Sequence, residues 1–277
     1  MKKTISILGS TGSIGMNTFK IIDKKKNNFQ INLLSANKNL KLISEQIKKY
    51  KPKFFIINDK KIFKKVSKRF RKSNTKILNG FEKINIKKIS YLTISAIPGI
   101  AGLKPTILMT KKSNKILIAN KESIICGWNL ISGELDKYKT EFIPVDSEHF
   151  SIFKLTNNIS REQIKKIIIT ASGGPFLNKK RSQKKIRIVD ALKHPNWKMG
   201  KKISIDSATM MNKVFEIIEA KKIFDISYKK LSILIHPKSY VHAVLKFKNG
   251  LTKMIVHDTS MEIPIFNSLY NSNRHIR

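Results

Sequence analysis

The chain has 277 residues, 41% of them hydrophobic, and carries a formal net charge of +38. This length is sufficient for a sizeable core in one large domain or in two. The lysines are spread along the whole chain and form no single basic stripe with interleaved aromatic residues. This distribution argues against a nucleic-acid-binding protein and favours a compositional bias on exposed faces. The charge should nevertheless steer anionic small ligands toward the protein.

Cysteine content and hydropathy exclude several further classes of protein. The single cysteine, Cys126, excludes a disulfide framework and a cysteine-based zinc site, and it suits a reducing compartment. Because no run of about 18 apolar residues occurs, no membrane span is expected. The first residues lack the apolar core and cleavage site of a secretory signal. We therefore predict a cytoplasmic protein without a membrane partner and without a specific nucleic-acid partner.

A glycine-rich turn follows the first predicted strand. Residues 4–8 form that strand, residues 9–15 have the spacing G-x-x-G-x-x-G, and an amphipathic helix then extends to about Lys25. This is the context of a dinucleotide-binding turn, in which glycines permit close backbone approach and a helix N-terminus offers its N–H groups to a pyrophosphate. An ordinary strand–helix turn is the alternative. In the dinucleotide interpretation, further donors are the hydroxyls of Ser10, Thr11 and Ser13.

The end of the next predicted strand, residues 30–36, indicates which dinucleotide would bind. A NAD site needs an acidic residue near this point for the ribose 2′-hydroxyl, but the sequence continues with Asn37, Lys38 and Asn39. An ammonium group there would pair with a 2′-phosphate, so the pattern favours NADP. The alternative is a polar turn that only caps the following helix.

Strands and helices continue to alternate as far as residue 118, which predicts a parallel sheet with crossover helices. Ligands of such sheets bind outside the carboxyl ends of the strands, so the loops at 95–102 and 119–123 are expected to border the nicotinamide. The remaining predicted strands are 53–57, 90–94 and 115–118, and the predicted helices are 40–50, 58–72 and 101–112.

Two carboxylates follow a strand that ends near residue 145. Asp146 and Glu148, separated by Ser147, could converge on one hard cation. The alternative is a helix start, in which Asp or Ser is the N-cap and Glu lies in the first turn.

A second small-residue loop comes after the predicted strand at 164–170. Ser172 precedes Gly173 and Gly174, whose backbone amides could bind an anion. The basic stretch at 179–188 could be an anion or RNA patch, but a solvated helix start explains it more simply.

Residues 194–220 concentrate polar groups beside small residues. The segment 194–200 lacks regular periodicity and contains Trp197 between Pro and Gly, which suits a mobile flap over a ligand. A strand at 202–205 and a helix from Thr209 are predicted next. On that helix Asn212 and Glu216 share a face, so Glu216 could complete a metal site, and the intervening Lys213 could hold a phosphate.

The last part of the sequence predicts three strands, at 231–236, 241–247 and 252–257, with a hairpin turn at 248–250. We expect an antiparallel patch there and a plausible subunit interface, and hence a homodimer. A short helix near 262–270 and a polar tail at 271–277 follow.

Taken together, the motifs GSTGSIG, ANKES, PVDSEH, SGGPF, HPNWKMGKKISIDSATMMNK and HPKSYVHA resemble those of the 1-deoxy-D-xylulose 5-phosphate reductoisomerase family, from residue 5 to about residue 265. The resemblance implies rearrangement of 1-deoxy-D-xylulose 5-phosphate and its reduction by NADPH to 2-C-methyl-D-erythritol 4-phosphate, for isoprenoid precursors. It also implies a divalent ion, Mg²⁺ or Mn²⁺, that polarises the carbonyl and stabilises enolate-like charge.

The resemblance assigns roles residue by residue. The implied metal ligands are Asp146, Glu148 and Glu216. The implied contacts to the small phosphorylated sugar are Ser172, Ser207, Asn212 and Lys213, with Ser147 and Lys121 by the reacting hydroxyls and His194 and Trp197 on the flap. Lys121, Glu148 and His194 would be the catalytic residues. NADPH would bind Thr11, Gly12, Ser13, Ile14, Asn37, Lys38, Asn39, Ala96, Asn120 and Glu122.

The predicted fold class is α/β, with a Rossmann-like parallel sheet in an NADPH-binding domain at 1–145 and an α+β catalytic domain with antiparallel strands at 146–277. Members of the family usually continue for roughly another hundred residues into a small helical domain, which is expected to be absent here. Three alternatives stay open: an NADP-dependent dehydrogenase of another phosphorylated substrate, which would need no metal triad, a nucleic-acid-binding protein, and an inactive fragment of the reductoisomerase.

Overall fold

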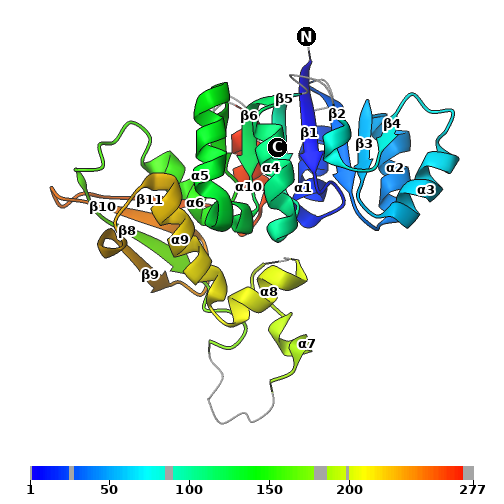
Figure 1. The fold of residues 1–277 in the computed structure, drawn as a ribbon. Coiled ribbons are helices and arrows are strands. Elements are labelled where there is room, and N and C mark those ends of the chain that lie inside the picture. Colours follow the sequence, from blue (N-terminus) through cyan, green and yellow to red (C-terminus); the bar gives the residue numbers. More distant parts are fainter. Residues whose placement is uncertain (1, 25–27, 85–89, 178–185, 198–199, 271–277) are drawn as a thin grey trace. The chain divides into compact units, whose positions relative to one another are not determined.

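The computed structural model describes residues 2–24, 28–84, 90–177, 186–197 and 200–270 (Figure 1). The chain divides into two compact units, Met1–Ile143 and Pro144–Arg277, which we call unit 1 and unit 2. Most of the basic stretch at 179–188, two residues of the predicted flap and the polar tail lie outside the described residues.

Unit 1 contains a seven-stranded sheet in the order β4-β3-β2-β1-β5-β6-β7. The pairings between neighbours from β4 to β6 are parallel, which confirms the predicted Rossmann-like sheet. The strands are β1 (Lys3–Leu8), β2 (Phe29–Ala36), β3 (Phe54–Ile57), β4 (Lys76–Leu78), β5 (Ser90–Ser95), β6 (Ser113–Ile118) and β7 (Glu141–Pro144). The helices are α1 (Ser13–Lys24), α2 (Leu40–Tyr50), α3 (Lys60–Arg69), α4 (Leu103–Thr110) and α5 (Lys121–Tyr138), with short 3-10 turns at η1 (Phe81–Lys83) and η2 (Ile100–Gly102).

The strands of unit 1 form where short apolar runs are buried on both faces of the sheet. All four residues of β3 are buried, as are the last four of β1, which is typical of a parallel sheet covered by helices. Polar side chains inside this sheet satisfy one another: the Ser6 and Ser90 hydroxyls lie 2.5 Å apart, and those of Thr93 and Ser113 lie 2.6 Å apart.

The order of the strands places a topological switch point between β1 and β5 (Figure 1). From β1 the chain continues through β2, β3 and β4 on one side, and then returns to β5 on the other side of β1. In open α/β sheets, ligands bind at such a point, outside the carboxyl ends of the two strands. Gly9 lies there with φ of +79°, and a Cβ on it would lie 2.6 Å from the Ala96 carbonyl oxygen. Only glycine therefore lets the loops after β1 and β5 approach this closely.

Unit 2 contains a four-stranded mixed sheet in the order β11-β10-β8-β9. Its strands are β8 (Ile164–Ala171), β9 (Leu231–Ile235), β10 (Val241–Phe247) and β11 (Thr252–Val256). Its helices are α6 (Ser147–Leu155), α7 (Ile188–Ala191), α8 (Lys201–Ala208), α9 (Met211–Phe224) and α10 (Glu262–Leu269), with a 3-10 turn at η3 (Tyr228–Lys230). Apolar side chains of α6, α9, β8 and β10, including Ile152, Ala220, Ile169 and Leu245, form its core.

The antiparallel prediction holds for β10, which pairs antiparallel with both β8 and β11. β9 differs, because it pairs parallel to β8. The connection between β8 and β9 contains α7, α8 and α9, and a long helical crossover is what a parallel pair of strands needs.

The strand predicted at 202–205 is wrong, since these residues lie in α8. A four-residue segment in which polar residues alternate with Ile203 and Ile205 does not distinguish a strand from a helix by itself. Here the surrounding residues favour the helix: Lys202 forms an ion pair of 2.7 Å with Asp206, four residues later, and the Ser204 hydroxyl donates to the Gly200 carbonyl at 3.2 Å. α9 begins at Met211, two residues after the predicted start.

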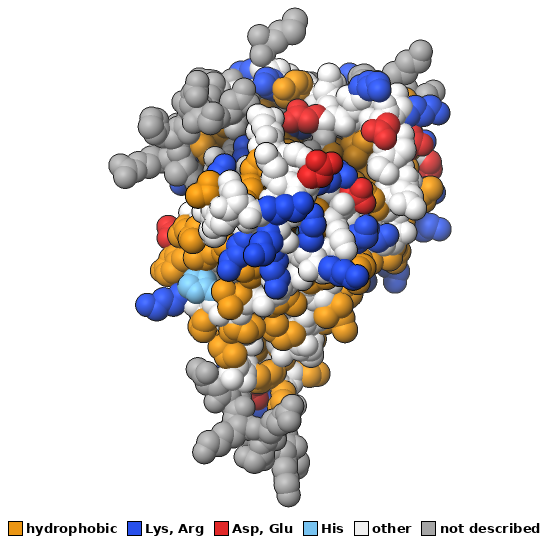
Figure 2. All heavy atoms as spheres, turned by 90° about the vertical axis from the view of Figure 1, so that its left-hand side faces the viewer, with side chains coloured by type: hydrophobic (Ala, Val, Ile, Leu, Met, Phe, Trp, Pro, Cys, Tyr) orange, Lys and Arg blue, Asp and Glu red, His pale blue; other side chains and the backbone are white. Residues whose placement is uncertain are grey.

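Figure 2 shows Lys and Arg side chains in several separate groups on one face, with acidic and hydrophobic side chains between them. They form no continuous basic stripe on that face. Among the described residues, none of the helices combines the length and the apolar character needed to cross a bilayer.

Candidate active site

The predicted cofactor residues at the start of α1 occupy the carboxyl end of β1. Thr11 and Ile14 are half-buried, whereas Gly12 and Ser13 are exposed. The Ser10 hydroxyl was predicted to donate to a ligand, but it is buried and donates to Gln46 Oε1 at 2.7 Å. The turn therefore offers its outer residues, and not Ser10, to a ligand.

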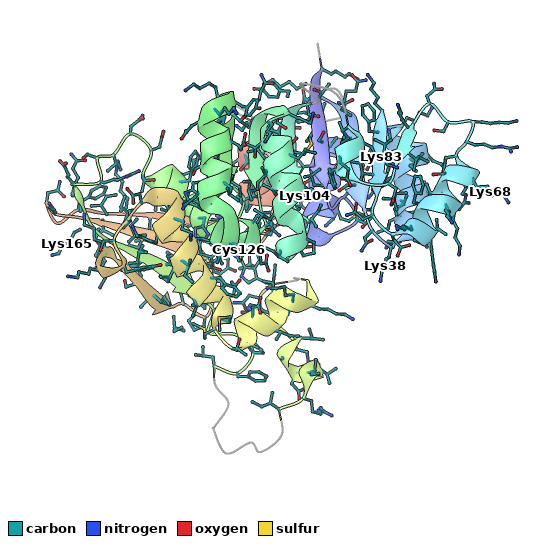
Figure 3. All side chains as sticks on the ribbon, in the orientation of Figure 1. Lys38, Lys68, Lys83, Lys104, Cys126 and Lys165 are labelled. Carbon is teal, nitrogen blue, oxygen red and sulfur yellow. The ribbon has the colours of Figure 1, made fainter. Side chains whose placement is uncertain are left out.

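The segment after β2 ends at the same edge of the sheet as the start of α1. Asn37, Lys38 and Asn39 are all exposed there. Asn39 is the N-cap of α2, since its Oδ1 accepts the Leu42 amide at 3.1 Å, so the capping interpretation holds for this residue. Lys38 projects from the edge at which the strands end (Figure 3).

The loops after β5 and β6 are tied together by Asn120. Its Nδ2 donates to the carbonyls of Ile97 and Gly99, the latter at 3.0 Å, and its Oδ1 accepts the Ser123 amide at 2.5 Å. This buried side chain therefore shapes the loop that contains Ala96 and caps α5, and its amide is fully used within the protein. Two further predicted residues, Lys121 and Glu122, lie in the first turn of α5, with Lys121 buried and Glu122 half-buried.

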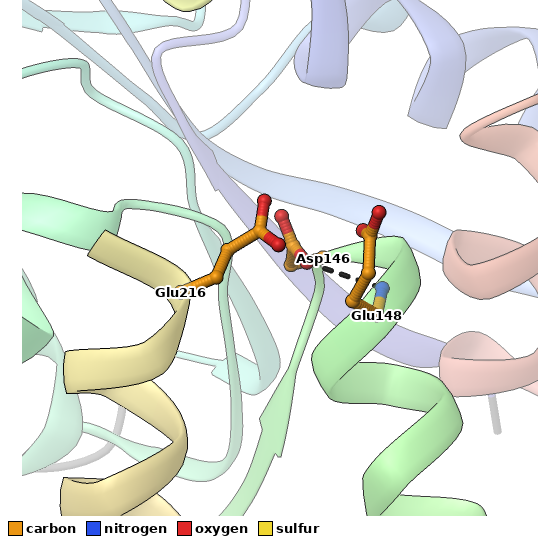
Figure 4. A group of neighbouring side chains, drawn as sticks. All are labelled: Asp146, Glu148 and Glu216. Atoms are coloured by element: carbon orange, nitrogen blue, oxygen red, sulfur yellow. Dashed lines mark hydrogen bonds between the residues drawn. The ribbon is translucent and has the colours of Figure 1, made fainter. Parts of the chain in front are cut away.

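Three carboxylates of unit 2 converge at the start of α6 and on α9. One oxygen from each of Asp146, Glu148 and Glu216 lies within 4.8 Å of the others (Figure 4). Asp146 is also the N-cap of α6, because its Oδ1 accepts the amides of Glu148 at 3.2 Å and His149 at 3.4 Å. The helix-cap and metal-ligand interpretations are therefore compatible, since capping holds the Asp146 carboxylate where it meets the others.

The shared face predicted for Asn212 and Glu216 is present on α9. Asn212 Nδ2 donates to Glu216 Oε1 at 2.5 Å, which orients a carboxylate that is only 1% exposed. Asn212 Oδ1 is buried and has no hydrogen-bond partner among the described residues. A buried acceptor in that condition fits the edge of a ligand site.

Lys213 lies against these carboxylates. Its Nζ is 3.2 Å from Glu148 Oε1 and forms a shorter ion pair with Glu216 Oε2. Burial alone would lower the pKa of Lys213, but the negative charges, first that of Glu148 and then that of Glu216, outweigh burial and raise that pKa. The ammonium group is thus charged and neutralises part of the cluster.

His149 joins the two halves of the cluster and was missed as a site residue in the sequence. Its Nδ1 lies 3.2 Å from Asp146 Oδ1, and its Nε2 lies 2.9 Å from the Glu216 carbonyl oxygen. Both neighbours are acceptors, so the two ring nitrogens both donate when the ring carries two protons. A histidine three residues after a candidate ligand, on the same helix face, was the available signal.

The hydroxyl oxygen of Ser172 accepts two hydrogen bonds. His194 Nδ1 accepts the amides of Asn196 at 3.2 Å and Trp197 at 3.0 Å, so the proton of the neutral ring is on Nε2, which donates to Ser172 Oγ at 3.0 Å. The Gly174 amide donates to the same oxygen at 3.1 Å. Burial lowers the pKa of His194, which favours this neutral form. The Ser172 proton is left to donate to a ligand, whereas the Gly174 amide, predicted to bind an anion, is already used.

The first residues of the predicted flap are anchored to the segment before β10. Asn196 Nδ2 donates to the Pro237 carbonyl and, at 3.1 Å, to the Ser239 hydroxyl. The Trp197 ring meets the His242 ring edge-on, with centroids 5.9 Å apart. His242 in turn stacks on His257 at 3.7 Å. Residues 196 and 197 of the predicted flap are thus fixed against the segment before β10 and against β10 itself.

Ser207 belongs to the last turn of α8 and is half-buried. Gly174 packs against it closely, because a Cβ on Gly174 would lie 2.7 Å from the Ser207 carbonyl oxygen. Met210 then takes a left-handed conformation with φ of +61° between α8 and α9. The loop after β8 therefore packs against the end of α8, which leads directly into α9. Ser172, Ser207, Asn212 and Lys213 all lie in unit 2, whereas the predicted cofactor residues and Lys121 lie in unit 1.

The sequence and the fold were compared with those of known proteins. The family model of 1-deoxy-D-xylulose 5-phosphate reductoisomerase matches residues 5–127, and the model of the C-terminal domain of that enzyme matches residues 142–224. The 1-deoxy-D-xylulose 5-phosphate reductoisomerase of Pelagibacter ubique is 56% identical over 276 residues, which cover 97% of this chain and 70% of that protein.

Two solved structures are similar over almost the whole chain. A DOX-P reductoisomerase in complex with NADPH, fosmidomycin and magnesium has a TM-score of 0.91 and 33% identity, and the match covers 99% of this chain and 71% of that one. The 1-deoxy-D-xylulose 5-phosphate reductoisomerase of Zymomonas mobilis, in complex with NADPH, has a TM-score of 0.89 and 32% identity, with 99% of this chain and 72% of that chain covered.

Proposed function

Because this chain belongs to the 1-deoxy-D-xylulose 5-phosphate reductoisomerase family, we propose that unit 2 holds the divalent metal ion of the reaction on Asp146, Glu148 and Glu216. The reaction is the NADPH- and metal-dependent conversion of 1-deoxy-D-xylulose 5-phosphate to 2-C-methyl-D-erythritol 4-phosphate, a step toward isoprenoid precursors. The convergence of three carboxylates within 4.8 Å is the observation that carries the assignment of the metal site.

The donor set fits a hard cation. All three proposed ligands offer carboxylate oxygens, which Mg²⁺ and Mn²⁺ prefer, and the orphaned Asn212 Oδ1 lies on the neighbouring turn of α9. When bound, the ion supplies Lewis-acid polarisation of the substrate carbonyl. His149 and Asn212 position two of the ligands, because His149 contacts Asp146 and Asn212 contacts Glu216.

The substrate phosphate and backbone oxygens are assigned to Ser172, Ser207, Asn212 and Lys213. The support for Ser172 is its free proton, since its oxygen already accepts two donors. We assign Ser147 and Lys121 to the reacting hydroxyls, and His194 and Trp197 to the flap, which excludes water when it closes. In this scheme His194 acts on the substrate partly through Ser172, whose orientation it fixes.

Unit 1 is assigned to NADPH, which supplies the hydride. The start of α1 would bind the pyrophosphate through Thr11, Gly12, Ser13 and Ile14, and Lys38 would pair with the 2′-phosphate. Ala96 and Glu122 would border the nicotinamide, and Asn37, Asn39 and Asn120 would also line the cofactor site, where Asn39 caps α2 and Asn120 joins the loops after β5 and β6. The proposed domains are accordingly a cofactor domain at 1–145 and a catalytic domain at 146–277.

NADPH oxidation by the purified protein, with 1-deoxy-D-xylulose 5-phosphate and Mg²⁺, tests the assignment. Glu216→Gln should reduce kcat by at least about 100-fold and leave the Kd for NADPH unchanged, because it removes a ligand charge from unit 2 only. Glu162→Gln, at an exposed position of the same unit, is the matched control. Full turnover after exhaustive chelation would instead favour a metal-independent dehydrogenase of another phosphorylated substrate.

We also propose a homodimer that works in the cytoplasm, as predicted from the sequence. The support for the dimer is a set of exposed apolar side chains on the edge strands of the unit 2 sheet, namely Ile233, Leu234, Ile235, Met254 and Val256. Sedimentation analysis of the purified chain tests it, and a monomer at micromolar concentration would contradict it.

A further inference from the structure

The ammonium group of Lys213 occupies the carboxylate cluster in the way that a bound cation would. It lies 3.2 Å from Glu148 Oε1 and is in closer contact with Glu216 Oε2. The side chains of Lys213 and Glu216 are 6% and 1% exposed, so water screens this pair poorly. Three carboxylates this close would repel one another strongly without a cation among them, and Lys213 supplies that cation.

A divalent ion would bind to the same three carboxylates. Mg²⁺ binds carboxylate oxygens at about 2.1 Å. The remaining oxygen of Glu216, Oε1, already accepts a hydrogen bond from Asn212. An ion on Glu216 and Glu148 would therefore lie within a few ångströms of the ammonium group in its present position, where two cations repel each other. Lys213 in its present position and a metal ion would therefore compete for the cluster.

We propose that Lys213 is a displaceable counter-ion: its ammonium group closes the carboxylate cluster when metal is absent, and metal binding moves it off the cluster and makes it available to an anionic ligand. The inference rests on the proposed function, because it requires the cluster to be the metal site. It predicts that metal and phosphate-type anions bind with positive coupling, since the ion frees the cation that the anion needs.

Metal affinity without any substrate tests the displacement. Mn²⁺ binding is measured by electron paramagnetic resonance for the wild type, Lys213→Met and Lys213→Arg. Lys221→Met is the matched control, because Lys221 lies on the same helix, is more exposed and pairs with Asp225. Lys213→Met should bind Mn²⁺ about tenfold more tightly, or more, since no cation has to leave. Lys213→Arg and Lys221→Met should stay close to the wild type.

Thermal unfolding gives an independent test, in which Lys213→Met should lower the stability of the metal-free protein although it raises the affinity for Mn²⁺. In excess EDTA, Lys213→Met should unfold at a lower temperature than the wild type, because Glu148 and Glu216 lose the cation that Lys213 provides, and Mn²⁺ should restore its stability. If the variant does not fold in EDTA, it is purified with Mn²⁺ and its affinity is measured by competition with a chelator. Unchanged or weaker Mn²⁺ binding by folded Lys213→Met would overturn the proposal.

Inorganic phosphate tests the coupling. Isothermal titration should show tighter phosphate binding to the wild type when Mg²⁺ is present, and Lys213→Met should lose this difference. Retained coupling in the variant would mean that phosphate responds to the ion directly, and the release of Lys213 to anions would be refuted. Glu216→Gln separates a failure of this proposal from a failure of the proposed metal site. If the wild type shows no Mn²⁺ binding that Glu216→Gln removes, the proposed metal site itself fails. If the wild type binds Mn²⁺ at that site but Lys213→Met gains no affinity, only the displacement of Lys213 fails.

Discussion

At the scale of single residues, several side chains of this protein have two functions at once. Asp146 caps α6 and faces the other two carboxylates, and His194 both orders the flap base and orients Ser172. Such residues cannot be assigned by asking whether they are structural or functional. The two functions are separated only by substitutions that retain one and remove the other.

The choice of NADPH over NADH is a residue-scale property of Lys38. Lys38→Glu should raise the KM for NADPH by at least about tenfold and change the KM for NADH much less, because the new carboxylate repels a 2′-phosphate that NADH lacks. Steady-state kinetics with both cofactors measures the ratio. Lys41→Glu, exposed on α2, is the control for the change in net charge. Equal effects on the KM values of the two cofactors would contradict the assignment of Lys38 to the 2′-phosphate.

The residue scale is also where prediction from the sequence was least complete. The three carboxylates were identified, since Asp146, Glu148 and Glu216 have ligand chemistry and suggestive spacing. The inward orientation of Ser10 was not foreseeable, because it depends on Gln46, which is distant in the sequence. The contact of Lys213 with Glu148 likewise depends on how α9 packs beside α6. A sequence gives the residue types available to a site, but not which of them contact one another.

At the scale of elements, α6 depends on its N-cap. Asp146→Asn should keep the cap, because an amide oxygen accepts the same two backbone amides, and Asp146→Ala should lose it at a cost of about 1 kcal/mol in the free energy of unfolding. Both variants should lose Mn²⁺ affinity. Urea unfolding in EDTA together with Mn²⁺ titration separates the two functions. Equal stability of the two variants would show that capping by Asp146 contributes little.

The flap base is a second element with a predictable response, in this case to pH. Burial lowers the pKa of His194 from its usual 6.5, so the unfolded chain binds a proton there more readily than the folded chain does. The stability from His194 is fully present above about pH 6.5 and decreases as the pH falls below that value. A proton on Nδ1 also abolishes the acceptor for the amides of Asn196 and Trp197.

The wild type should therefore lose more stability between about pH 7.5 and pH 5.5 than His194→Gln does. His257 responds in the same direction, because burial lowers its pKa as well, and it contributes equally to both proteins. Thermal unfolding at the two pH values measures the difference. A larger loss in His194→Gln would contradict the orientation assigned to the imidazole ring.

The strands and helices predicted up to residue 118 are all present, but β4 and the long helix α5 were not predicted. The predicted strands of that part of the chain were recognisable as short apolar runs bounded by turn residues. The sequence at 202–205 predicts a strand wrongly, because the alternation of two isoleucines with polar residues over four positions is too short to exclude a helix. The parallel pairing of β9 depended on the long connection from β8, which the local sequence of β9 does not contain.

At the scale of the whole molecule, the net charge of +38 should act on ligands through its long-range field. Salt screens this field, with a Debye length of about 10 Å at 0.1 M. The KM for the phosphorylated substrate should therefore rise several-fold when NaCl is increased from about 50 to 500 mM, and kcat should change less. Initial-rate measurements across the salt series test this. A KM that does not respond would mean that the lysines have no steering function.

The whole-molecule charge was also the feature most open to misinterpretation in the sequence. Taken alone it suggests nucleic acid, whereas the motifs specify a small-molecule enzyme, and the family comparison agrees with the motifs. The composition gives the average charge of the chain, whereas the function depends on the residues at a few positions. Here the family was recognisable because several motifs occur in the order and spacing typical of it.

The close approach at Gly9 has a consequence for how variants of this protein are interpreted. A methyl group at this position would force the loop after β1 away from the loop after β5. A Gly9→Ala protein would then bind dinucleotide poorly although residue 9 needs no contact with it, and a binding assay alone would misidentify a spacer as a ligand contact. The spacing between these two loops thus depends on a position that carries no side chain.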